Sequence, residues 1–167
     1  INISKLSNEN LNEMFCIITS NQPDQVKISQ AQTLLKKYTD IPESLEGCLY
    51  QLSNNIDENC RQLSTLILYK SIDHNWEKIN EEQKEKIKTY ILDLYSKEKV
   101  YKVLKGIGYA IFKICKKTLE QNKWDNLLNM VFSPPEKYSQ GQEKLFEINL
   151  HIIADLVGAV GYLLKNK

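Results

Sequence analysis

Apolar residues recur along most of this chain at spacings of three and four, the period of an amphipathic helix and not the alternation of a strand. The clearest stripe runs from Ile87 to Tyr95, and Asn80 with Gln83 in front of it fits a capping box. The 4 prolines lie between such stripes and not within them. The pattern predicts an all-α chain of about eight helices with no strand.

The expected helices fall into consecutive pairs with related patterns. Cys60-Arg61 precedes Leu68-Tyr69 much as Val26-Lys27 precedes Leu34-Leu35. A helix-pair repeat of about 40 residues is typical of a HEAT-like solenoid, in which each pair buries its apolar face against its neighbours. We therefore expect a right-handed α-solenoid, an alpha-alpha superhelix, of about four HEAT-like pairs, at residues 8–38, 42–74, 80–119 and 122–165.

Composition narrows the class of protein. The 167 residues suffice for one domain, and the hydrophobic (42%) and charged (26%) fractions are those of a globular chain. No apolar run approaches the roughly 20 residues of a membrane span, and the net charge of +1 favours neither a nucleic-acid coat nor an acidic tail. The chain begins with Ile1 in place of Met, so we expect it to be a piece of a longer protein.

Cysteine and histidine usage gives little support to a metal site or an enzyme. Cys16, Cys48, Cys60 and Cys115 lie far apart in apolar helical patterns, which predicts reduced core cysteines in a cytosolic or nuclear protein.

Neither histidine, His74 or His151, has a partner at metal-ligand spacing, and no catalytic motif occurs. His74 is expected at a helix end, and Gly106-x-Gly108 is better explained by close helix packing than by a dinucleotide site. We expect no enzyme activity, no metal and no cofactor.

The segment from Lys97 to Lys117 is strongly basic, with seven lysines and the single acid Glu98. Three interpretations stay open: a solvated convex face, a docking surface for acidic protein partners, or a nucleic-acid site, the last without the usual aromatic and arginine platform. If the fourth and sixth helices are the inner helices of their pairs, the concave binding face carries Tyr69, Asp73, Lys105, Phe112 and Lys116. That placement favours protein docking.

Residues 57–72 (Asp-Glu-Asn-Cys-Arg-Gln-Leu-Ser-Thr-Leu-Ile-Leu-Tyr-Lys-Ser-Ile), followed by Trp76, Ile79 and residues 82–88, resemble the amino-terminal segment of the importin-beta (karyopherin-beta) superfamily. Residues 31–35 and Trp124-Asp125-Asn126-Leu127-Leu128 extend the likeness to about 31–131. Three departures are Ser64-Thr65 in place of small alanines, Asp125 in place of a proline, and Tyr69-Lys70-Ser71 where many members have Leu-Lys-Asn.

The resemblance implies the amino-terminal part of a nuclear import receptor that shuttles between cytoplasm and nucleus and binds the small GTPase Ran in its GTP form. Cargo proteins and nucleoporins would be bound by repeats outside this chain, with no direct contact to nucleic acid or membrane. A nuclear export receptor, a generic HEAT-repeat scaffold for another complex, and an undetected helical hydrolase are the alternatives.

Four residues are expected to have structural roles. Arg61 follows Asp57 by one helical turn, and HEAT repeats commonly use such an Asp and Arg to link adjacent repeats. Trp76 and Trp124 are expected to anchor neighbouring helices.

Overall fold

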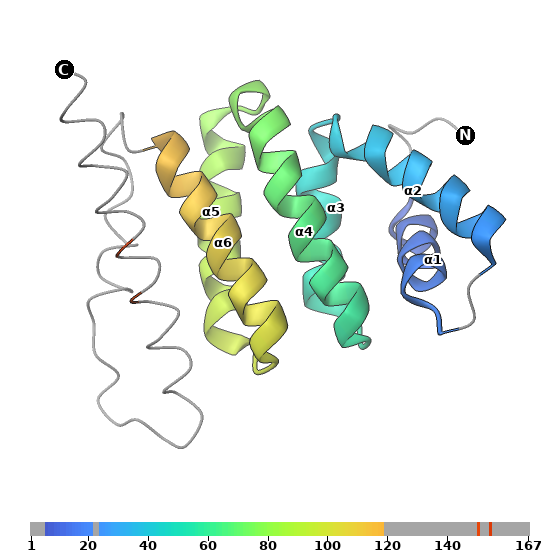
Figure 1. Ribbon diagram of the computed structural model, residues 1–167. Coiled ribbons are helices and arrows are strands. Elements are labelled where there is room, and N and C mark those ends of the chain that lie inside the picture. Colours follow the sequence, from blue (N-terminus) through green and yellow to red (C-terminus); the bar gives the residue numbers. More distant parts are fainter. Residues whose placement is uncertain (1–5, 22–23, 119–149, 151–153, 155–167) are drawn as a thin grey trace.

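The computed structural model describes residues 6–21 and 24–118, together with residues 150 and 154. This part of the chain is all helical, with no strand, which confirms the predicted fold class (Figure 1). Its elements are α1 (Asn8–Thr19), α2 (Gln25–Thr39), α3 (Glu43–Asn54), α4 (Glu58–Asn75), the short 3₁₀ helix η2 (Trp76–Lys78), α5 (Glu81–Lys97) and α6 (Tyr101–Thr118).

Side-chain caps fix where several of these helices begin. The Asp24 carboxylate accepts from the backbone N–H groups of the first turn of α2, and the Asp57 carboxylate does the same for α4. At α5, the predicted capping box is present, because Asn80 and Gln83 each accept a hydrogen bond from the other's backbone N–H. Local sequence therefore sets these helix starts before any tertiary packing.

The helices form two layers. In Figure 1, α4 and α6 lie side by side, with α3 and α5 behind them. The second helices α2, α4 and α6 contact each other in order, as do the first helices α1, α3 and α5. Each antiparallel pair therefore stacks on the next, which is the arrangement of a HEAT-like solenoid.

Within the described residues, the consecutive helices of each pair span 8–39, 43–75 and 81–118. Apart from residues 150 and 154, the expected fourth pair at 122–165, which contains Trp124 and His151, lies outside the described residues.

One apolar cluster runs through all six helices and joins the two layers. Phe15, Leu68, Ile91 and Ile111 are completely buried within it, and Trp76 in η2 is 1% exposed. Buried polar side chains connect different helices inside this cluster: Ser64 Oγ donates to the Cys48 carbonyl at 2.8 Å, and Asn75 Nδ2 donates to the Thr39 carbonyl at 2.8 Å. Because an unpaired buried polar group is costly, these bonds fix how α4 sits on its neighbours.

Arg61 lies between two interhelical turns. Its guanidinium donates to the backbone carbonyls of Asn55 and Ile56 at 3.1 and 2.9 Å, in the turn before α4. It also contacts both carboxylate oxygens of Glu98, in the turn before α6, at 3.0 and 3.3 Å. The carboxylate partner is therefore Glu98 and not the expected Asp57, whose oxygen is used to cap α4.

The expectation that all four cysteines are core residues is wrong for one of them. Cys48, Cys60 and Cys115 are buried, but Cys16 is exposed on α1. Cys16 directly follows Phe15, which belongs to the buried stripe with Leu11 and Met14. Successive residues of a helix point in different directions, and at Cys16 the side chain faces solvent.

Candidate protein-docking face on α4 and α6

The exposed and half-buried side chains of α4 and α6 form a surface that we call the α4–α6 face. The residues that α4 contributes are three and four positions apart, so they lie on one side of that helix. The residues that α6 contributes follow the same helical period over a longer stretch. Its members are Leu66, Tyr69 and Asp73 of α4, and Lys102, Lys105, Tyr109, Phe112, Lys113, Lys116 and Lys117 of α6.

A glycine allows the two helices to approach closely behind this face. A Cβ added to Gly106 would overlap the side chain of Thr65, whose Cβ lies only 2.6 Å from that position. Thr65 is itself buried at 1% exposure, so it has little room to move. Any larger residue at Gly106 would therefore push α6 away from α4 or force Thr65 out of place. Gly106, the first residue of the Gly106-x-Gly108 pair noted in the sequence, therefore serves close helix packing.

Lys113 joins the two helices at the centre of the face. Its Nζ lies 2.6 Å from Asp73 Oδ2 and 4.6 Å from the ring centroid of Tyr69, close enough for an ion pair and a cation–π contact. Lys117 Nζ lies 3.9 Å from the other oxygen of Asp73. Two lysines of α6 thus share one carboxylate of α4, and the aromatic ring covers one of them.

The pKa of Lys113 reflects this environment. Burial lowers the pKa, but the hydrogen bond and the charge of Asp73, followed by contact with Tyr69, outweigh burial and raise it above the ordinary lysine value. Lys113 therefore stays cationic at neutral pH. It holds Tyr69 and Asp73 in fixed positions instead of extending freely into solvent.

The basic segment is only partly neutralised. Lys97 pairs with Asp93, and Lys102 pairs with Glu58 at 2.7 Å and with the Asn59 amide oxygen at 2.7 Å. Lys105 and Lys116 are exposed and form no ion pair with the described residues. Uncompensated positive charge on this face therefore lies at Lys105 and Lys116, and also at Lys113 and Lys117, which share the single negative charge of Asp73.

Apolar side chains lie among these charges. Leu66 is 56% exposed and Tyr109 is 47% exposed, and Lys105 Nζ lies 5.9 Å from the Tyr109 ring centroid. The surface therefore combines two exposed apolar side chains, Leu66 and Tyr109, with lysines that have no ion-pair partner among the described residues. Protein-protein interfaces have this composition, with aromatic residues enriched at the centre and a polar rim.

The five residues expected on the binding face are exposed or half-buried on α4 and α6, and their role in binding a partner stays a prediction. The structure brings Tyr69 and Asp73 together through Lys113, which the sequence analysis did not select. Leu66 and Tyr109 were also missed. The helical period could have identified Tyr109, since Lys105, Tyr109, Phe112 and Lys116 form one continuous stripe. Leu66 has the same helical spacing relative to Tyr69 and Asp73, but its apolar side chain resembles those of the buried neighbours Ile67 and Leu68, so the sequence did not mark it as exposed.

The rest of the described structure offers little for catalysis. His74 lies in the last turn of α4, as expected, and its Nδ1 is 2.7 Å from Asp40 Oδ1 in a largely exposed pair. No group of three or more potential metal ligands occurs among the residues that the structure describes. None of the helices within 6–21 and 24–118 is long and apolar enough to cross a bilayer.

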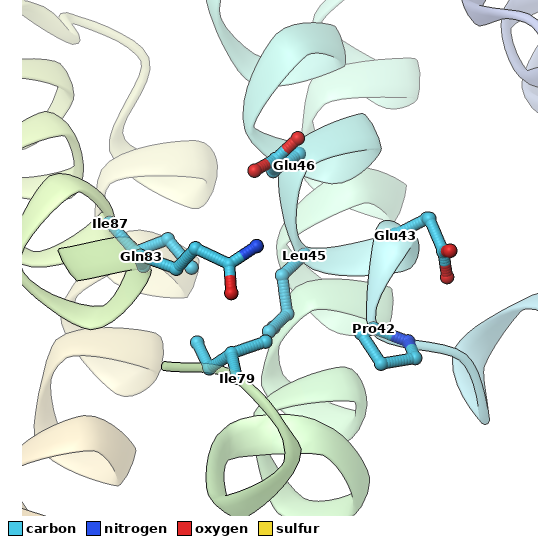
Figure 2. A pocket seen from close by; sticks show the side chains of 7 residues that line it. All are labelled: Pro42, Glu43, Leu45, Glu46, Ile79, Gln83 and Ile87. Carbon is cyan, nitrogen blue, oxygen red and sulfur yellow. The ribbon is translucent and has the colours of Figure 1, made fainter. Parts of the chain in front are cut away.

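A small pocket lies in the other layer, between α3 and α5 (Figure 2). Leu45, Ile79 and Ile87 form its apolar part, and Figure 2 shows Gln83 extended toward Leu45 while the Glu43 carboxylate points away. The pocket's titratable lining residues are Glu43 and Glu46, and its lining includes no histidine, cysteine or serine.

Residues 31–97 match the family model of the importin-beta N-terminal domain. The match covers the end of α2 and all of α3, α4 and α5, and it confirms the resemblance to the importin-beta superfamily drawn from the sequence. It includes Tyr69 and Asp73 of the candidate face, whereas α6 follows the matched range. Comparison with curated proteins and with solved structures gives no significant match. The matched family comprises transport receptors and not enzymes.

Proposed function

We propose that the chain is part of a nuclear import receptor and binds Ran in its GTP form, because residues 31–97 match the family model of the importin-beta N-terminal domain. The family match is the observation that carries this proposal. Receptors of this family move between cytoplasm and nucleus. Ran binding would couple the release of cargo to arrival in the nucleus, while cargo and nucleoporins contact other repeats of the receptor.

The α4–α6 face is the surface that we assign to Ran. Support comes from its place on the second helices of the pairs, and from its exposed Leu66 and Tyr109 beside the unpaired Lys105 and Lys116. Apolar anchors provide most of the binding free energy of an interface. Unpaired lysines increase the association rate with an acidic partner and make that rate sensitive to salt.

Discrimination between nucleotide states needs no chemistry from this chain. The switch segments of a small GTPase are ordered by the terminal phosphate of GTP and its magnesium ion, and are released after hydrolysis. A face that contacts the ordered switches therefore distinguishes GTP from GDP without touching the nucleotide. The chain needs no cofactor of its own in this mechanism.

The direct test is the affinity of the 167-residue chain for Ran loaded with each nucleotide. We expect binding to Ran-GTP at least about tenfold tighter than binding to Ran-GDP, a difference of about 1.4 kcal/mol. Biolayer interferometry with immobilised Ran measures both dissociation constants, and raising the salt concentration should weaken the GTP complex. Equal affinity for the two forms, with a helical circular dichroism spectrum, would favour a generic HEAT-repeat scaffold instead.

A nuclear export receptor would give the same preference for Ran-GTP. The full-length receptor separates the two, because Ran-GTP would displace cargo from an import receptor and strengthen cargo binding to an export receptor.

A further inference from the structure

Two cysteines from different helix pairs lie next to each other. Cys16 is on α1 and Cys60 is in the first turn of α4, 44 positions later, and their Sγ atoms are 3.9 Å apart. Cys16 is exposed to solvent, whereas Cys60 is completely buried. A soluble oxidant can therefore reach Cys16 directly. Cys60 lies next to Cys16 but is buried in the core.

The buried Cys60 thiol has a second polar neighbour, the Thr19 hydroxyl. The Thr19 hydroxyl donates its single proton to the Phe15 carbonyl at 2.9 Å. Thr19 Oγ1 also lies 3.3 Å from Cys60 Sγ, within hydrogen-bond distance of the buried thiol.

The four thiols differ in how readily they react. Burial raises the pKa of Cys48 and Cys115 to about 12, so these thiols stay protonated and shielded. Burial also raises the pKa of Cys60 to about 11, which protects it from direct oxidation. Of the four, Cys16 alone is exposed, so oxidation should begin there.

We propose that Cys16 and Cys60 are a peroxide-sensitive dithiol, which closes to a disulfide between the first and second helix pairs. In the first step the Cys16 sulfur attacks a hydroperoxide, the O–O bond breaks, and Cys16 sulfenic acid and an alcohol or water are formed. In the second step the Cys60 sulfur attacks the Cys16 sulfur. The S–S bond forms, the S–O bond breaks, and the leaving hydroxide takes the Cys60 proton as water. The two thiols lose two electrons in total, and the hydroperoxide gains them.

Closing the bond requires only a local movement. A disulfide bond is about 2.05 Å long, so the two sulfur atoms must approach by about 2 Å, and they lie on two helices, α1 and α4, that already contact each other. The product would tie α1 to α4 and constrain the unfolded chain, so the oxidised form should be the more stable one. Reduction by a dithiol reverses the link.

The test is oxidation of the 167-residue chain with hydrogen peroxide, followed by proteolysis without reductant and mass spectrometry. We expect one linked peptide pair, containing Cys16 and Cys60, with a loss of about 2 Da relative to the two free peptides. Cys48 and Cys115 should stay alkylatable after unfolding. The melting temperature should rise by about 5 °C or more on oxidation and return on reduction.

Two variants separate the steps. In Cys60→Ala, Cys16 should accumulate as sulfenic acid that dimedone traps, and in Cys16→Ser, Cys60 should remain reduced. The proposal is overturned if the parent chain collects Cys16 sulfinic acid without the link, or forms dimers joined through Cys16. These outcomes are read from the parent chain itself, so they do not depend on either variant folding.

Discussion

Arg61→Ala is expected to lower the free energy of unfolding by about 3 kcal/mol, because the change breaks a largely buried charge pair and leaves Glu98 without its cation. The Arg61 and Glu98 side chains are only 15% and 11% exposed, so solvent screens this pair far less than a surface ion pair. Two turn carbonyls lose their donor as well. Urea unfolding followed by circular dichroism measures the change.

Arg61→Lys is the matched variant. A lysine keeps the charge but cannot reach both oxygens of Glu98 and two backbone carbonyls at once, so we expect it to recover less than half of the lost stability. Stability of Arg61→Ala within about 0.5 kcal/mol of the parent would contradict the structural role. The Arg61→Ala variant should still bind Ran when binding is measured on the folded protein.

The pH dependence gives an independent check. Burial raises the pKa of Glu98, but the Arg61 guanidinium and the backbone N–H groups of Val100 and Lys99 outweigh it, and the net shift is downward. A carboxyl whose folded pKa is lowered stabilises the fold above its ordinary pKa of about 4.3, and the contribution is lost as pH falls through the lowered value. The stability difference between the parent and Arg61→Ala should therefore be largest near neutral pH and shrink in acid.

The double variant Leu66→Ala/Tyr109→Ala is expected to weaken Ran-GTP binding by about tenfold or more. Both side chains are about half exposed in the free chain, so truncating them removes contact area from the interface with little loss of core packing. Tyr69→Ala and Phe112→Ala should also weaken binding. The charged Lys97 and Lys99 should matter less, since peripheral charges mainly change association rates.

The opposite layer provides matched controls for this experiment. Tyr50 on α3 and Tyr90 on α5 are 44% and 38% exposed, similar to Tyr109, and they lie in the layer that carries no proposed contact. Tyr50→Ala and Tyr90→Ala should leave the affinity for Ran-GTP unchanged within about twofold. A loss confined to these two variants would move the interface to the α3–α5 side.

The sequence predicted most of the fold because local signals determine most of it. The capping box at Asn80 and the three- and four-residue apolar spacing are short-range features, and each corresponds to a helix start or a buried stripe in the structure. The stacking of pairs followed from their repeat length. These signals need no knowledge of which residues meet across the chain.

The parts that could not be predicted are those that depend on long-range pairing. From the sequence alone, Arg61 could have paired with any acidic residue in a turn. Only the stacking of the helix pairs shows that its partner is Glu98, in the turn between α5 and α6. The contact of Lys113 with Tyr69 and the proximity of Cys16 to Cys60 each join residues 44 positions apart. Cys16 also fits a helical apolar stripe, yet its small offset from that stripe leaves it exposed.

Photo-cross-linking tests most directly whether the α4–α6 face binds Ran in its GTP form. Tyr109, or Tyr90 as the control, would be replaced by the photo-reactive amino acid benzoylphenylalanine, which reacts with groups in direct contact. Binding of Ran at the α4–α6 face predicts a cross-link from position 109 when Ran carries a GTP analogue and little cross-linking when Ran carries GDP. It also predicts no cross-link from position 90. A cross-link from position 90 and none from position 109 would contradict it.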